Sequence, residues 1–115
     1  MTQKNLVFSK SVRKKKIQRT LVWNEERAKL KIKFDAKGII TCEIKRKNCW
    51  HNSALGFVHR HKRLWYYSYP RLLGDFNQVI LGCNQCHQEI EYDKELTERI
   101  FNRLRGPEKM HLTMV

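Results

Sequence analysis

Residues 24–34 carry two competing hydrophobic patterns. Asn24 is followed by two glutamates, which is typical of a helix N-cap with acidic residues in the first turn. Three apolar residues between Leu30 and Phe34 instead alternate with lysines, and a period of two indicates a strand. Of the two alternatives we favour a helix over residues 24–34.

Short β-prone segments occupy the middle of the chain. A turn at residues 35–38 precedes a predicted strand over residues 39–44. Residues 56–63 predict another strand, and residues 78–81 predict a brief apolar one. Between them, residues 64–74 form an aromatic stretch that continues as an irregular loop.

The last third of the chain predicts two helices. The first covers residues 84–91, and Asp93 caps a second whose apolar residues recur at helical spacing up to Leu104. Gly106 and Pro107 end that helix. Together the predicted elements make a small α+β fold.

The length and net charge of the chain limit the number of domains and the classes of binding partner. The chain has 115 residues and a mass of 13.9 kDa, which suits one small domain and excludes a multidomain enzyme. Its formal net charge is +13, and residues 1–71 alone carry +15 while residues 72–115 carry −2. Such an excess of positive charge favours a polyanion, and above all a nucleic acid, as partner. The sequence has no apolar run long enough to span a membrane and no hydrophobic signal-peptide region, so we expect a cytoplasmic protein.

A run of four basic residues marks residues 1–23 as a separate basic arm. The apolar residues around the run keep no sustained period, so we expect this arm to be mobile or to become ordered on DNA. The alternative is a solvated tail that aids solubility. The four residues are Arg13, Lys14, Lys15 and Lys16.

The four cysteines predict a structural zinc site. Cys83 and Cys86 are separated by two residues, which lets both sulfurs reach one tetrahedral zinc from a single turn. Cys42 and Cys49 are the remaining thiols and complete a four-cysteine site by elimination. Their six-residue gap is longer than the usual spacing, so the alternative is a buried Cys42 and an incidental Cys49.

Three histidines lie near this predicted site or near the basic residues. His59 and His61 share a face of the predicted strand, and cations beside them lower a histidine pKa towards a free base. His87 directly follows Cys86, so zinc binding would fix the turn that carries its imidazole.

The order of His59, Asn77 and the Cys83–His87 segment resembles the HNH endonucleases. Members of this family have a ββα-metal motif, and one variety adds a zinc-bound cysteine tetrad. Residues 56–63 are similar to a strand of small phage-encoded members. The resemblance to the family covers roughly residues 24–105, leaving the arm and a tail at residues 106–115 outside it. The resemblance implies a ββα-metal fold with flanking helices, located in the host cytoplasm if phage-encoded.

The same resemblance assigns roles to individual residues. His59 would be the general base that activates water, and His87 would bind a catalytic Mg²⁺ or Mn²⁺ ion. Asn77 would brace the loop and orient His59, or contact the metal. Many members carry a metal ligand directly before the base, where this chain has Val58. His61 is then a second metal ligand or an alternative base, with Asp75 as a further candidate ligand.

Basic and aromatic residues follow the first catalytic candidate. Arg60, Lys62 and Arg63 are expected to contact DNA phosphates. Trp65 and the tyrosines after it either stack on exposed bases or form core, and we favour core for Trp65.

The expected function is a metal-dependent DNA endonuclease that nicks or cuts double-stranded DNA, with no membrane partner. Nothing in the sequence sets its oligomeric state. One alternative is a non-catalytic, zinc-stabilised module that binds DNA or RNA. Another is a protein-interaction adaptor whose positive charge binds an acidic partner.

Overall fold

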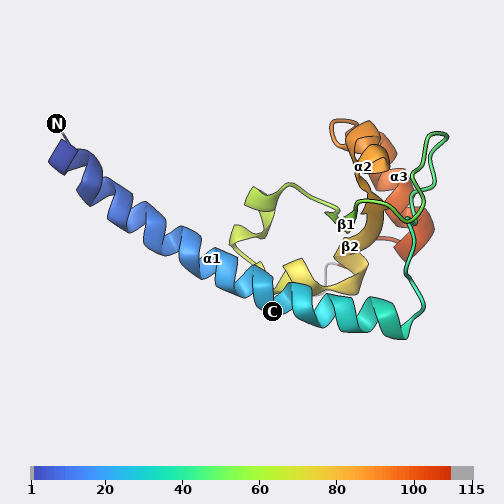
Figure 1. Cartoon of the computed structure of the whole chain (residues 1–115), viewed down its shortest axis with the longest axis horizontal. Coiled ribbons are helices and arrows are strands. Elements are labelled where there is room, and N and C mark those ends of the chain that lie inside the picture. Colours follow the sequence, from blue (N-terminus) through green and yellow to red (C-terminus); the bar gives the residue numbers. More distant parts are fainter. Residues whose placement is uncertain (1, 110–115) are drawn as a thin grey trace.

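A computed structural model describes the backbone of residues 2–109 and the side chains of residues 14–109. The Arg13 side chain and residues 110–115 of the predicted tail lie outside this described part. In Figure 1 a long helix extends from a smaller body that contains a two-stranded sheet. The elements are α1 (Thr2–Ala36), β1 (Leu55–His59), β2 (Val79–Cys83), α2 (Asn84–Ile90) and α3 (Lys94–Arg105), with 3-10 turns η1 (Arg63–Tyr67), η2 (Pro70–Gly74) and η3 (Phe76–Gln78) between the strands.

Helix α1 differs from the prediction in its extent. The helix expected over residues 24–34 is confirmed, but it begins at Thr2 and takes in the segment predicted as an arm without regular structure. Asn24 therefore lies inside the helix and is not its N-cap. The segment contains no glycine or proline and is rich in good helix formers such as lysine, so a helix needs no apolar stripe here. The domain boundary at residue 23 stays a prediction.

Burial explains why the helical pattern prevails over the alternating one. Leu30 and Phe34 are four residues apart, lie on one helix face and are almost fully buried. Ile32, which a strand would place beside them, is 72% exposed. Gly38 (φ 73°) ends the helix, and the Ile39 N–H donates to the Phe34 carbonyl.

The strand predicted over residues 39–44 is wrong. This segment is irregular, because its groups bond individually to other parts of the chain. The Glu43 N–H donates to the Leu81 carbonyl, and the Glu43 carboxylate accepts the Leu81 N–H, both at 2.8 Å. The Cys42 N–H donates to the His51 carbonyl at 2.7 Å, which holds the segment against the loop that follows it.

The remaining elements agree with the prediction in type. β1 and β2 pair antiparallel, with Leu55 opposite Cys83 and His59 opposite Val79. β1 ends at His59, four residues earlier than the strand predicted over residues 56–63. The chain then forms the 3-10 turns η1 and η2 where an aromatic stretch and an irregular loop were expected. Helix α2 and helix α3 match their predictions closely, and the Asp93 side chain accepts the Leu96 N–H as the N-cap of α3.

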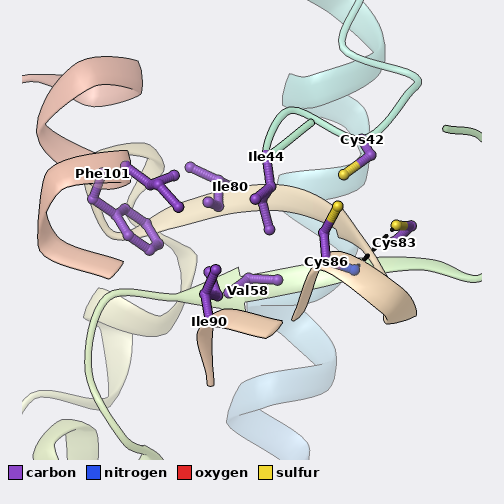
Figure 2. Packing of buried hydrophobic residues seen from close by; sticks show 9 residues of the cluster. Cys42, Ile44, Val58, Ile80, Cys83, Cys86, Ile90 and Phe101 are labelled. Carbon is purple, nitrogen blue, oxygen red and sulfur yellow. Dashed lines mark hydrogen bonds between the residues drawn. The ribbon is translucent and has the colours of Figure 1, made fainter. Parts of the chain in front are cut away.

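Separate groups of side chains pack on the two faces of the sheet. On one face, Val79 and Leu81 of β2 pack with the buried residues of α1. On the other face, Val58 packs with residues of α2 and α3, including Ile90 and Phe101. Figure 2 shows this second cluster with Phe101 at one end and cysteine sulfurs at the other. The sheet is thus placed between α1 and the α2–α3 pair.

A buried ion pair ties the irregular segment to α3. The Arg105 side chain is 5% exposed and donates two hydrogen bonds of 2.7 and 2.8 Å to the Glu43 carboxylate. Its Nε also donates to the carbonyls of Phe76 and Val79. Removing one partner leaves the other charge buried without compensation.

We therefore expect Arg105→Met to lower the free energy of unfolding by about 3–5 kcal/mol. Chemical denaturation followed by circular dichroism measures this loss. The matched control is Arg103→Met on the exposed side of the same helix, which should change stability by less than about 0.5 kcal/mol. Equal stability of the two variants would show that the buried pair contributes little.

Candidate metal centre and histidine groove

The four cysteines come together as predicted. Their sulfur atoms all lie within 4.8 Å of one another, and those of Cys49 and Cys83 are 3.9 Å apart. Zinc–sulfur bonds of about 2.3 Å in a tetrahedron place the sulfurs roughly 3.8 Å apart, so the cluster has the dimensions of a metal site. Figure 2 shows Cys42, Cys83 and Cys86 with their sulfurs at the same end of the core.

Two structural devices bring these sulfurs together. Cys83 ends β2 and is the N-cap of α2, where its sulfur accepts the N–H of Cys86 at 3.4 Å. Cys42 and Cys49 come from the irregular segment and its loop, in which Lys45 has φ 54°. That left-handed residue turns the chain back, so the six-residue gap closes on one metal position.

Backbone N–H groups point at the sulfurs. Trp50 donates to Cys83 at 3.3 Å, Arg46 donates to Cys86 at 3.4 Å, and His51 donates to Cys49 at 3.2 Å. Burial opposes ionisation of Cys83, but the N–H groups directed at its sulfur lower the pKa of that thiol to about 7. Burial raises the pKa of the Cys49 and Cys86 thiols, so a bound cation would be needed to hold all four sulfurs as thiolates, the form that binds zinc.

A groove of about 810 Å³ runs beside the sheet on the α2 side. His59, at the end of β1, and His87, in the first turns of α2, both line it. The predicted base and the predicted metal-binding histidine therefore border the same groove. The residues predicted to contact phosphates, Arg60, Lys62 and Arg63, line it as well.

The His59 ring is held in one orientation. Its Nε2 lies 2.9 Å from the Leu73 carbonyl, and only a protonated ring nitrogen can donate to that oxygen. The lone pair is consequently on Nδ1. Trp23 and Tyr66 contact the ring edge-on, each with a centroid distance of 5.2 Å.

Burial lowers the pKa of His59 to about 4. The hydrogen bond to Leu73 opposes this shift, whereas the charges of Arg63 and His87 add to it. The ring is therefore neutral at pH 7 and Nδ1 is free to accept a proton.

His61 also lines the groove, but its ring contacts Glu108 and Trp65. Its Nε2 lies 2.6 Å from a carboxylate oxygen of Glu108, and its ring stacks on Trp65 at 4.0 Å. Burial tends to raise the pKa of Glu108, but hydrogen bonds from Gln78 and His61 lower it overall. As a metal ligand or base, His61 would have to use its other nitrogen or leave Glu108.

Asn77 does not reach the His59 ring. Its side chain is buried, donates to the Pro107 carbonyl at 3.2 Å and accepts the Lys109 N–H at 3.1 Å. It therefore positions the segment after α3. Asp75 accepts the Asn77 N–H at 2.9 Å and lines a different hollow from that of His59 and His87.

Val58 occupies the position where a metal ligand was sought. It is 4% exposed and packs with Ile90 of α2 in the apolar cluster. Its position thus supplies core packing and no donor atom.

The basic side chains predicted to contact phosphates differ in whether they already bond to other groups of the chain. Arg60 is tied to the Asn77 and Gly106 carbonyls at 2.8 and 2.6 Å, so its first role is structural. Lys62 donates to the Glu91 carbonyl, and Arg63 lies over the Trp23 ring. Lys14, Lys15 and Lys16 are exposed on α1.

Sequence reasoning missed the residues that support His59. Trp23 and Leu73 reach it only through tertiary packing, and no local pattern marks them. Trp65 has the expected packing role, because it lies among Tyr66, Leu72 and Leu73.

Helices long and apolar enough to cross a membrane are not found among the described residues. Comparison of the chain with protein-family models, with curated proteins and with solved structures gives no match in any of the three.

Proposed function

We propose that this chain is a metal-dependent DNA endonuclease of the HNH type. The observation that carries the proposal is the placement of His59 and His87 on one groove, one from the strand pair and the other from the helix that follows it. Two antiparallel strands and a helix in this order are what a ββα-metal motif requires. The cysteine cluster braces the same strand and helix.

His59 supplies the general base in this proposal. Its Nε2 is occupied by Leu73, so Nδ1 takes the proton from an attacking water. The low pKa keeps Nδ1 unprotonated throughout the physiological range, although a weaker base transfers the proton with less driving force.

His87 is the proposed ligand for a catalytic Mg²⁺ or Mn²⁺ ion. Such an ion stabilises negative charge on the phosphate and on the leaving oxygen. Among the described residues, the cysteine cluster is the one group of three or more metal-binding side chains, so the groove offers few protein donors. A magnesium ion bound there would have the imidazole of His87 as its ligand from the chain, and would complete its coordination with waters and with oxygens of the substrate phosphate.

Zinc is the proposed occupant of the cysteine cluster, with a structural role. Four thiolates leave no open coordination position for a substrate. The ion would hold β2, α2 and the irregular segment together, and so fix the helix that carries His87.

The charge distribution supports double-stranded DNA as the substrate. Helix α1 has 35 residues and therefore extends about 50 Å, enough to follow roughly 15 base pairs. Among the residues whose side chains are described, exposed lysines occur from Lys14 to Lys33 of this helix. Lys62 and Arg63 line the groove, and Arg63 lies over Trp23 in the middle part of the same helix. Phosphate contacts of this kind position DNA without reading its sequence.

The direct experiment incubates an end-labelled DNA duplex with the protein, with and without added Mg²⁺, while zinc content is monitored. Omitting magnesium is preferable to adding a chelator, because a chelator also removes zinc. We expect magnesium-dependent cleavage and, for His87→Ala, a rate at least about 10–100-fold lower, which is the usual loss when only an outer-shell partner of a metal ligand is removed. Gln88→Ala, an exposed neighbour on α2, should retain the wild-type rate. Equal rates for the two variants would remove His87 from the mechanism.

The second candidate is a zinc-stabilised module that binds DNA or RNA without cutting it. Val58 in the core and His61 bound to Glu108 favour it, because they leave His87 without an evident protein co-ligand. This candidate predicts tight binding whose affinity falls steeply with salt, and no cleavage with any divalent ion.

A further inference from the structure

A second, smaller pocket lies between α1 and the turns η1 and η2. Its volume is about 200 Å³, the room of roughly seven water molecules. This is enough for a single nucleobase and too little for a base pair. One face of α1 forms a wall, since its lining residues Lys16, Arg19, Thr20 and Trp23 recur at helical spacing.

The pocket combines positive charge with aromatic rings. Lys16, Arg19 and Arg63 line it, and none of the lining residues is acidic. The Arg19 guanidinium lies 4.1 Å from the centre of the Tyr67 ring, and that of Arg63 lies 5.2 Å from the Trp23 ring. Stacked guanidinium groups keep their N–H edges available for phosphate and present a flat surface on which a base can stack.

This pocket adjoins the histidine groove. Arg63 lines both spaces. Trp23 and Tyr66 line the pocket and contact the His59 ring in edge-to-face geometry. Leu73, whose carbonyl holds that ring, is another lining residue. A strand whose phosphate lies at His59 would therefore bring the next nucleotide to the pocket.

We propose that this pocket binds one unpaired nucleotide of a DNA strand, adjacent to the phosphate held in the groove. The location beside the cut rests on the proposed function. The base stacks on the guanidinium and aromatic layers, and its phosphate is bound by Lys16 and the arginine N–H groups. A paired base must first leave its helix, which costs energy that an already unpaired base does not require.

The test is a binding titration without magnesium, so that no DNA is cut. A fluorescently labelled duplex with one bulged 2-aminopurine is compared with the matched, fully paired duplex. We expect at least about tenfold tighter binding of the bulged duplex, with quenching of 2-aminopurine emission as the base stacks. Equal affinities, or no quenching, would overturn the proposal.

Two pairs of variants assign the effect to the pocket. Tyr67→Ala should lose the preference, whereas Tyr69→Ala, a tyrosine of similar exposure that lines another hollow, should keep it. Lys16→Ala should weaken the bulged complex more than Lys15→Ala, which removes the same charge outside the pocket. Loss of the preference in Tyr69→Ala but not in Tyr67→Ala would contradict the assignment.

The outcome is separable from that of the proposed function. A preference for the bulged duplex in a protein that never cuts would support the pocket and reject the nuclease. Magnesium-dependent cutting by a protein that binds both duplexes equally would reject the pocket alone.

Discussion

Cys83→Ser is expected to lose both the bound zinc and the cooperative fold. Cys83 is fully buried and joins β2 to α2, so its sulfur connects the sheet to the helix that carries His87. Structural zinc contributes about 10–16 kcal/mol of apparent binding free energy, comparable to or larger than the roughly 5–15 kcal/mol net stability of a typical domain. Elemental analysis and thermal unfolding followed by circular dichroism measure the two losses.

The neighbouring residue provides a control for this substitution. Asn84→Ser changes an exposed side chain at the start of the same helix and should keep zinc and the unfolding transition. A Cys83→Ser protein with one equivalent of zinc and an unchanged transition would show that the cluster is not a structural metal site.

His59→Ala is expected to lower the cleavage rate by about 10²–10⁴-fold, the usual contribution of a general base. The substitution removes the imidazole of a groove-lining residue and also the contacts of the ring with Trp23 and Tyr66. Initial cleavage rates must therefore be compared together with an unfolding curve of each variant. A rate loss in a protein that remains folded at the assay temperature is the predicted result.

His61→Ala is the matched control for His59→Ala. Its ring lines the same groove but is bound to Glu108, so we expect a smaller loss of rate. A large loss in His61→Ala with an active His59→Ala would exchange the roles of the two residues.

The pH dependence of cleavage gives a second measure of His59. With a pKa of about 4, the ring stays neutral as the pH falls from 8 to 6 and gains a proton only in more acidic solution. Protonation of this base should consequently cause no loss of rate between pH 8 and pH 6. A decline centred near pH 6.5, absent in a variant lacking His59, would mean that the ring titrates like an exposed histidine.

Local signals in the sequence were sufficient for the junction of β2 and α2, which holds two of the four cysteines. The spacing of Cys83 and Cys86 identified half of the cysteine cluster, and Asp93 correctly marked the start of α3. Each of these signals depends on residues within one or two turns of each other. The gathering of all four cysteines followed because only two other thiols were available to complete the site.

Long-range contacts determined what the sequence did not predict. Residues 39–44 have β-prone side chains, but their conformation is set by individual hydrogen bonds to Leu81 of β2 and to the His51 carbonyl in the loop that follows. Asn77 was expected beside His59, yet its side-chain amide donates a hydrogen bond to the carbonyl of Pro107, 30 residues later. Likewise, nothing near Arg105 in the sequence indicates its partner Glu43, 62 residues away.

The nuclease proposal is tested most directly by incubating supercoiled plasmid with the zinc-loaded protein and Mg²⁺, with His59→Ala run in parallel. We expect the wild type to convert the plasmid to nicked or linear DNA, and both omission of magnesium and His59→Ala to prevent this conversion. Plasmid that stays supercoiled with Mg²⁺ and with Mn²⁺, although the folded protein retains it in a gel shift, would contradict the nuclease and leave a DNA-binding module.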